Sequence, residues 1–165
     1  MKSAKFFKLG FTLIELLIVI AIIGAIATFT VLAPIGSTKK ARDARRMSDL
    51  RQYQAALETY ANKNSGLYLG APAVVDASSV NVCGASGLNL TGNCPEDPLN
   101  NNSTGYKYKY QSTDGTAGTA TATGFVLWTK RENDTAVSYI VVCSTGRSGI
   151  STSIPAGGVC PTTLN

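Results

Sequence analysis

The sequence predicts an α+β protein in which a long N-terminal helix packs against a small antiparallel β-meander. Three observations lead to this fold class. Residues 11–33 form a dense apolar block, residues 34–63 continue with apolar side chains at helical spacing, and strand-like segments follow after residue 104. The 165 residues leave room for one ordinary domain in addition to the N-terminal segment.

The apolar block begins directly after a short charged segment. Residues 1–10 read MKSAKFFKLG, and the block that follows reads FTLIELLIVIAIIGAIATFTVL. Its length matches a bilayer span and exceeds the apolar region of an ordinary secretory signal. No Ala-x-Ala cleavage site follows the block, whereas a small residue, Gly10, precedes it. We therefore predict that residues 1–10 are a leader peptide and residues 11–33 a transmembrane or filament-core helix.

One acid, Glu15, interrupts the apolar block. A carboxylate inside a bilayer costs a few kcal/mol even on lenient scales, so this residue needs a partner or a function. A cut after Gly10 would create a cationic α-amine on Phe11, four residues and about 6 Å of helix rise away. In a bundle of copies, Glu15 of one copy could neutralise the amine of another. The alternative is a chance interfacial charge near the end of an uncut signal anchor.

Residues 10–15, GFTLIE, closely resemble the type III signal sequence of type IV prepilins and type II secretion pseudopilins. The resemblance implies that a prepilin peptidase cuts after Gly10 and methylates the new amine of Phe11, and that Glu15 guides assembly. It also implies a pilin-like fold. The partners it implies are copies of the chain in a helical filament, the prepilin peptidase/methyltransferase, the inner-membrane assembly platform and, before assembly, the lipid bilayer.

The same resemblance implies where the protein resides. The precursor is expected in the bacterial inner membrane, with a single pass and a cytoplasmic N-terminus, and the mature protein in an extracellular or periplasmic filament. In pilin filaments, the helix is often loosened between an early glycine and a following proline. Gly24 to Pro34 is the corresponding segment of this chain.

Residues 34–63 are predicted to be an amphipathic continuation of the helix. Pro34 marks a weak point because it removes a backbone donor, and the residues at 62–66, NKNSG, supply a stop signal. The apolar stripe consists of Ala41, Ala44, Met47, Leu50, Tyr53, Leu57 and Tyr60.

Basic side chains crowd the first half of this second segment, at Lys39, Lys40, Arg42, Arg45, Arg46 and Arg51. Such a run is typical of a solvated helix face. Its positive charge would favour the cytoplasm, in conflict with the lysine-bearing leader. Two interpretations reconcile the conflict: the cluster pairs with acids on neighbouring heads, or with phospholipid phosphates before assembly.

Four cysteines, Cys83, Cys94, Cys143 and Cys160, all lie beyond the apolar block. The chain has no histidine and no Cys-x-x-Cys spacing, so no metal site is predicted. An even count in an exported domain favours two disulfides and an oxidising compartment. Of the three possible pairings, we favour the nearest-neighbour one, Cys83–Cys94 with Cys143–Cys160.

Residues 64–165 are predicted to form a disulfide-stapled globular head. Residues 65–104 and 112–123 are rich in small polar residues and are expected to be loops, the second an exposed, mobile hairpin loop. Residues 144–165 form a tail with little apolar pattern. A disulfide between Cys143 and Cys160 would hold this tail against the last strand. In type IV pilins, which this arrangement resembles, such a region often lies on the filament surface.

Three strands are expected in the head, at Tyr106–Gln111, Gly124–Lys130 and Ala136–Cys143. Alternation along the first strand places its tyrosines on one face and its lysines on the other. We predict that the tyrosine face packs on the helix stripe and does not stack nucleic-acid bases.

No constellation of nucleophile, base or metal ligands is present, so the chain is predicted not to be an enzyme and to need no cofactor. The formal net charge of +5 includes three leader lysines, and the basic residues of the head are too few to support nucleic-acid binding. Four Asn-x-Ser/Thr sequons, at Asn89, Asn101, Asn102 and Asn133, are hints of glycosylation at the level of composition only.

The sequence therefore predicts a pilin, the structural subunit of a type IV pilus-like filament. The alternative is a major pseudopilin of a type II secretion system. The Asp97-Pro98 dipeptide before the predicted sheet resembles the Asp-Pro signature of those proteins. Many such proteins bind calcium in a late loop, but the equivalent tail here has no carboxylate, and Glu132 with Asp134 is only a faint substitute. A lesser alternative is an uncut, signal-anchored surface binding protein.

Overall fold

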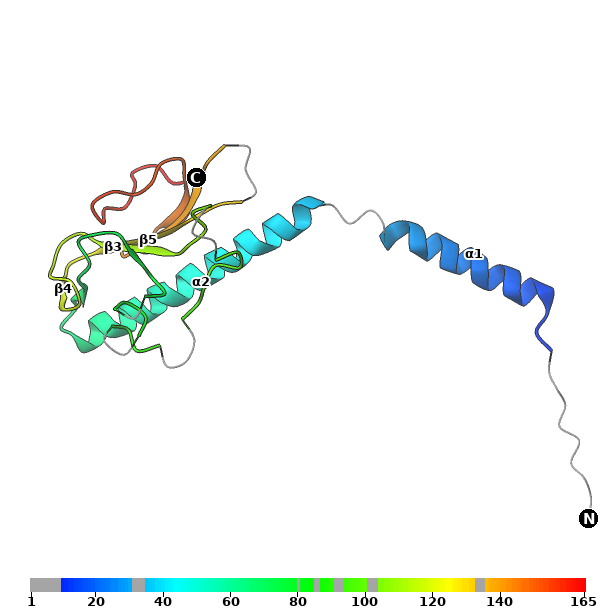
Figure 1. The fold of residues 1–165 in the computed structure, drawn as a ribbon, viewed down its shortest axis with the longest axis horizontal. Helices are drawn as coiled ribbons and strands as arrows, with labels where there is room; N and C mark the ends of the chain where they lie inside the picture. Colours follow the sequence, from blue (N-terminus) through cyan, green and yellow to red (C-terminus); the bar gives the residue numbers. More distant parts are fainter. Residues whose placement is uncertain are drawn as a thin grey trace, which may run out of the picture. The chain divides into compact units, whose positions relative to one another are not determined.

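The structure, a computed structural model, describes residues 10–30, 35–79, 81–84, 87–90, 94–100, 104–132 and 136–165 (Figure 1). The chain divides into two compact units, Met1–Ser37 and Thr38–Asn165. The first contains helix α1 (Leu13–Thr30), and the second contains nearly all of helix α2 (Ile35–Lys63) and every strand. The predicted α+β class is confirmed, with the helices first and antiparallel sheets after them.

Helix α1 is apolar on all sides. Its large apolar side chains, as far as Ile26, are exposed by between 45% for Val19 and 87% for Leu13. Judged by length and hydropathy together, none of the helices in the described part of the chain qualifies as a membrane span. Loosening in a filament is predicted for Gly24 to Pro34. The helix runs unbroken from Gly24 to Thr30, and residues 31–34 of that segment lie outside the described residues.

Helix α2 buries one face and ends where the sequence signals a stop. Leu50, Tyr53 and Leu57 on that face are completely buried. After Lys63 the backbone turns left-handed at Ser65 (φ 59°) and Gly66 (φ 84°), and the Gly66 amide donates to the carbonyl of Ala61 at 2.8 Å. A left-handed glycine that closes the last turn is a common helix C-cap, so the stop has a local cause.

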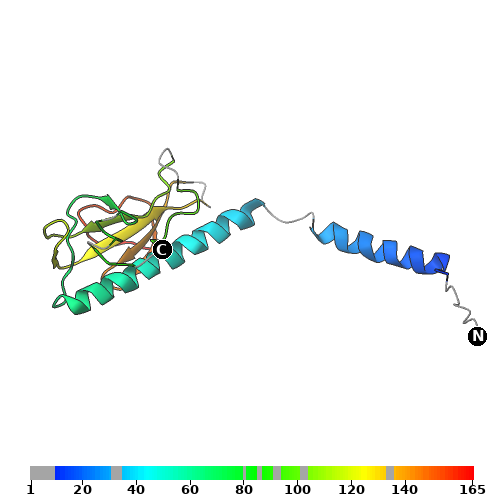
Figure 2. The same cartoon turned by 60° about the horizontal axis from the view of Figure 1, so that its bottom comes forward.

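Five antiparallel strands form the main sheet, in the order β2-β3-β5-β6-β7. The expected three-strand meander is its centre, and the structure adds one short strand at each edge. Helix α2 runs along one face of this sheet (Figure 2). The strands are β2 (Val75–Asp76), β3 (Lys109–Ser112), β5 (Phe125–Lys130), β6 (Tyr139–Cys143) and β7 (Ser148–Ser151).

The two faces of the sheet bury different clusters. Toward α2, Tyr108 and Tyr110 join the helix stripe in the main core, and the rings of Tyr53 and Tyr108 meet edge to face at 6.2 Å. These two tyrosines therefore pack on the helix, as predicted. Val126 and Trp128 project to the opposite face, where a smaller apolar cluster includes Cys143, Val141, Tyr139, Cys160 and Leu164.

Most of the stretch from Ser112 to Thr123 is exposed, as expected, although Ser112 and Ala122 are buried. The expectation that the whole stretch is a hairpin loop was wrong. It contains β4 (Ala120–Ala122), which pairs with β1 (Tyr68–Leu69) from the region also expected to be loop. The side chain of Asp114 accepts hydrogen bonds from the backbone nitrogen of Thr123 at 2.7 Å and its hydroxyl at 2.9 Å. Local side-chain bonds of this kind can order a polar segment without an apolar core.

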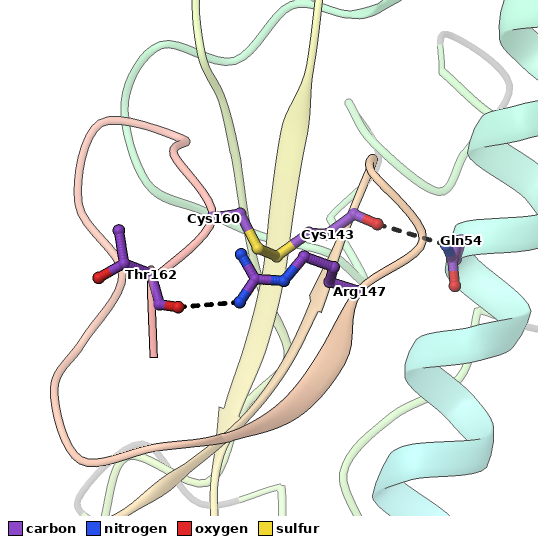
Figure 3. The surroundings of a disulfide bond; sticks show 5 residues. All are labelled: Gln54, Cys143, Arg147, Cys160 and Thr162. Carbon is purple, nitrogen blue, oxygen red and sulfur yellow. Dashed lines mark hydrogen bonds between the residues drawn. A yellow bond between two sulfur atoms is a disulfide. The ribbon is translucent and has the colours of Figure 1, made fainter. Parts of the chain in front are cut away.

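Both disulfides have the favoured nearest-neighbour pairing. Cys83–Cys94 joins Cα atoms 5.8 Å apart, and Cys143–Cys160 joins Cα atoms 5.6 Å apart. Figure 3 shows the second bridge at the end of β6, where the Gln54 side chain of α2 donates to the Cys143 carbonyl at 3.3 Å. This bridge therefore fixes the tail to a strand that is itself bonded to the helix.

The C-terminal tail covers an edge of the sheet. Asn165 exchanges two backbone hydrogen bonds with Ile150 of β7, at 2.9 and 3.1 Å. Gly158, at φ +67°, brings the tail so close to β3 that an added Cβ would lie 2.1 Å from the Ser112 carbonyl carbon. An edge strand that is covered in this way is protected from pairing with other chains.

Candidate processing and assembly site

The predicted cleavage point lies just outside the first helix. Gly10, Phe11 and Thr12 are not helical, and α1 begins at Leu13. Phe11 is 80% exposed. The Gly10–Phe11 peptide bond is therefore free of the helical hydrogen-bond ladder and presents an open backbone.

Thr12 and Glu15 form a reciprocal capping box at the start of α1. The Thr12 backbone nitrogen donates to Glu15 Oε2 at 3.0 Å, and the Thr12 hydroxyl donates to the same oxygen at 2.8 Å. In return, the Glu15 backbone nitrogen donates to Thr12 Oγ1 at 3.3 Å. This Thr-x-x-Glu arrangement satisfies amide groups that would otherwise lack partners at a helix start.

The capping role of Thr12 was not predicted, although the spacing Thr12-x-x-Glu15 ahead of an apolar run is a recognised signal for it. The capping box also fixes where the Glu15 carboxylate lies. The Thr12 backbone nitrogen, to which it is hydrogen-bonded, belongs to the peptide bond with Phe11, so the carboxylate lies one residue from the nitrogen that cleavage would convert to an amine. A carboxylate accepts about four hydrogen bonds, so the cap leaves Glu15 able to accept another donor.

A second cluster of charge lies in the head, and it changes the interpretation of the basic run. Arg46 is completely buried, and its guanidinium binds both oxygens of Asp97, at 2.7 and 2.9 Å. The side chain of Asp97 is likewise fully buried. The expectation of a solvated basic face was wrong at this position, because Arg46 falls on the buried stripe of α2.

Further acids complete the charge cluster around Arg46. Asp43 accepts from Arg46 at 2.7 Å, and Glu132 is bound by both Arg42 and Arg46. Hydrogen bonds from Arg42 hold the pKa of Glu132 below its ordinary value. Arg46 also lies over the ring of Tyr106, 4.8 Å from its centre. The acids that pair with these two arginines thus come from the same chain.

The predicted site residues are placed as follows. Gly10, Phe11 and Glu15 lie together at the start of α1, and all four cysteines are paired. Glu132 is engaged by arginines, whereas its suggested companion Asp134 lies outside the described residues. So do three of the four sequon asparagines, Asn101, Asn102 and Asn133. Within the described ranges, no group of three or more potential ligands is placed to hold a metal ion.

The described chain thus has an apolar N-terminal helix with a capped start, followed by an α+β head. The family model described as the prokaryotic N-terminal methylation motif matches residues 7–31. The chain therefore carries the signal motif of type IV pilins and pseudopilins. The motif indicates a membrane-anchored precursor that later becomes part of a surface filament.

No curated protein and no solved structure gives a significant match to the chain. The motif covers the start of the chain up to residue 31. It supports a pilin-like or pseudopilin role in general, and the motif family consists of structural subunits.

Proposed function

We propose that this protein is a pilin, the structural subunit of a type IV pilus-like filament, assembled after cleavage between Gly10 and Phe11. The observation that carries the proposal is the match of residues 7–31 to the N-terminal methylation motif. Two features of the structure support it: the open backbone at the cleavage point, and a following helix that exposes apolar side chains all round. A helix of that kind needs lipid or sister helices to cover it.

In this proposal the prepilin peptidase cuts after Gly10 and methylates the amine of Phe11. The precursor sits in the inner membrane through residues 11–33, with its N-terminus in the cytoplasm. During assembly, Glu15 of one copy accepts the cationic amine of Phe11 from a neighbouring copy. Such a contact would replace two separately buried charges by a pair, which is why it would favour one axial stagger between subunits.

The head favours a pilus over a secretion pseudopilus. Its tail, bounded by Cys143–Cys160, packs on the outer face of the sheet, which is the face away from α2. Two disulfides also suit an oxidising exterior. The second candidate, a major pseudopilin, is favoured by the Asp97-Pro98 dipeptide alone. Since Asp97 is the buried partner of Arg46, its carboxylate has a role in the fold of the head that does not depend on the class of filament.

The N-terminus of the purified protein tests cleavage directly. We expect mass spectrometry to find an N-methylated Phe11 as the first residue, in material that sediments with fibres sheared from the cell surface. If the fibres were confined to the periplasm, the protein would be a pseudopilin and not a pilin. A chain that retains Met1 or Lys2 would instead identify an uncut signal anchor and end the pilin proposal.

Substitutions at Glu15 separate its two possible roles. Glu15→Gln keeps the capping box, because glutamine serves at that position, but removes the charge. We expect both Glu15→Ala and Glu15→Gln to abolish filaments while cleavage continues. Thr12→Ala, the matched control, keeps the charge, loses about 1 kcal/mol of capping energy and should still give filaments. The filament yield in sheared fractions is the readout.

A different result would contradict the proposed pairing. If Glu15→Gln gave normal filaments and Glu15→Ala did not, residue 15 would act only by capping α1. The proposed pairing with the amine of Phe11 would then be wrong, although a pilin with an N-methylated Phe11 would remain.

A further inference from the structure

The outer face of the main sheet is only partly covered by the C-terminal tail. Cys160 and Leu164 of the tail pack on the apolar cluster that contains Val126, Trp128 and Val141. The same face carries a concavity of about 450 Å³, whose lining includes Lys107, Lys109, Trp128, Lys130, Val137 and Ile154. Its volume lies in the range of small-molecule sites.

The strand register explains why these side chains meet. Lys109 of β3 lies opposite Trp128 of β5, and Lys130 of β5 lies opposite Tyr139 of β6. Side chains two residues apart along β5 share a face, so Trp128 and Lys130 project to the same side. The lysines therefore come from the β3–β5 side of the concavity and its aliphatic rim from the flanks of β6 and β7.

The concavity carries a surplus of positive charge. Lys107 and Lys109 share one carboxylate, that of Asp76, at 3.5 and 2.5 Å. Lys130 contacts the Thr104 carbonyl at 3.3 Å and has no carboxylate partner among the residues that the structure describes. The Lys130 ammonium also lies 5.3 Å from the centre of the Tyr106 ring. Among the described residues, the three lysines of the concavity therefore share a single carboxylate partner, and their surplus positive charge favours an anionic ligand.

The opposite rim is apolar and open. Val137 and Ile154 are each 57% exposed, and Tyr139 is half-buried beside them. A ligand that fills the concavity must offer carbon–hydrogen surface to this rim and negative charge to the lysines. A small inorganic anion offers only charge. A nucleic-acid strand needs exposed ring faces for stacking, and Trp128 as a residue is only 3% exposed.

We propose that this concavity, the lysine–tryptophan pocket, binds an acidic saccharide, a pyranose whose carboxylate contacts Lys130 and the Lys107–Lys109 pair while its carbon–hydrogen face rests on Val137 and Ile154. Ammonium groups donate up to three hydrogen bonds each, so they serve both a carboxylate and the neighbouring hydroxyls. The pocket is formed within the head of a single chain. The proposal therefore holds whether or not the protein assembles into a filament.

The single tryptophan of the chain lines the pocket and provides the readout. The full-length protein in uncharged detergent micelles is titrated with trigalacturonate while the emission of Trp128 is recorded. We expect a saturable change that weakens when salt rises from about 50 to about 200 mM, because the interaction is charge-driven. No change up to the solubility limit of the saccharide would overturn the proposal.

Variants place the ligand within the pocket. Lys130→Gln should weaken binding roughly fivefold to tenfold, since it removes a charge-assisted hydrogen bond. Lys63→Gln, which changes an exposed lysine outside this pocket, should leave the affinity unchanged. Val137→Asp should weaken binding, because it adds a like charge beside the ligand. Val137→Lys should strengthen binding, because the lysine stem keeps carbon–hydrogen surface at the rim and its ammonium adds positive charge. Misfolding would weaken binding in both variants.

Other probes decide the class of ligand. Maltotriose should bind much more weakly than trigalacturonate, and equal affinity would refute the role of charge. Inorganic phosphate should compete poorly, and saturation by phosphate alone would reduce the pocket to a simple anion site. Tighter, Lys130-dependent binding of a single-stranded DNA oligomer would replace the saccharide by nucleic acid and overturn the proposal.

Discussion

The two helices of this protein differ in whether their apolar side chains are buried. Helix α1 is apolar on every side, and its large side chains remain exposed within the single chain. Helix α2 is polar on most of its surface, and one stripe is completely buried against the sheet. The packing that stabilises α2 is therefore supplied within its own unit, whereas the unit that contains α1 leaves the apolar surface of that helix uncovered.

The comparison also separates two uses of charge. Glu15 at the start of α1 has its partners within one turn, so its capping box would form in almost any setting. Arg46 in α2 depends on Asp97, which lies 51 residues later in the sequence. Only the folded head brings that carboxylate to the helix. The capping box of Glu15 stabilises the start of its own helix, whereas the Arg46–Asp97 ion pair joins α2 to the rest of the head.

The largest effect is expected at the buried arginine. Arg46→Ala would leave the Asp97 carboxylate buried without its cation, and loss of one partner from a buried pair costs roughly 3–5 kcal/mol. Arg45→Ala is the matched control, since the Arg45 side chain is 65% exposed and should cost less than about 1 kcal/mol. Urea unfolding followed by Trp128 fluorescence measures both. Equal costs would show that the cluster does not hold α2 to the head.

A pair of leucines tests the central contrast between the helices. Leu50→Ala in α2 removes a completely buried side chain and should destabilise the head by roughly 2–5 kcal/mol. Leu17→Ala in α1 removes one that is 63% exposed and should leave the unfolding of the head unchanged. The same titration reads both variants. If Leu17→Ala destabilised the head, the exposure assigned to α1 would be wrong.

The tail disulfide should rank next. Replacing both Cys143 and Cys160 by alanine removes a crosslink between positions 17 apart in the sequence. A crosslink of that span stabilises the folded state by roughly 3 kcal/mol. The tail also donates and accepts the hydrogen bonds at Asn165 that cover β7. We therefore expect faster amide exchange at Ile150 in the double variant. Unchanged exchange would mean that the tail stays on the sheet without its bridge.

The smallest effect concerns acid. Hydrogen bonds from Arg42 lower the pKa of Glu132 below 4.5, so its contribution to stability is complete above that pH and is lost as the pH falls through the lowered pKa. We expect Glu132→Gln to cost about 1 kcal/mol at pH 7 and to flatten the loss of stability below about pH 4.5. Urea titrations at a series of pH values check this. An identical pH slope in the two proteins would exclude Glu132 as the source.

Several features of the fold could be predicted because their signals are short-range. The helix stop lies in five consecutive residues, and the buried stripe repeats every three or four positions. The nearest-neighbour disulfides agree with the shortest loops. The region from residue 112 to 123 was misjudged because its order comes from side-chain bonds of Asp114 and from pairing with β1, about fifty residues earlier.

Arg46 shows where the sequence signal was present but was given the wrong meaning. Asp43, Arg46, Leu50, Tyr53 and Leu57 follow one another at steps of three and four, which is the spacing of a single helix face. A charged pair on an otherwise apolar face is normally expected to turn toward water. It is buried here because Asp97 and Glu132 approach from distant parts of the chain.

The amino-acid sequence by itself determined the apolar N-terminal segment, the order Gly10, Phe11, Glu15 and the helix-then-strand plan, because each depends on residues that are neighbours in the chain. Only the tertiary structure decided which charges are buried, which edge of the sheet the tail covers and which lysines share one pocket. Those outcomes depend on pairs of groups far apart in sequence, and their energies arise only when folding removes water from between them.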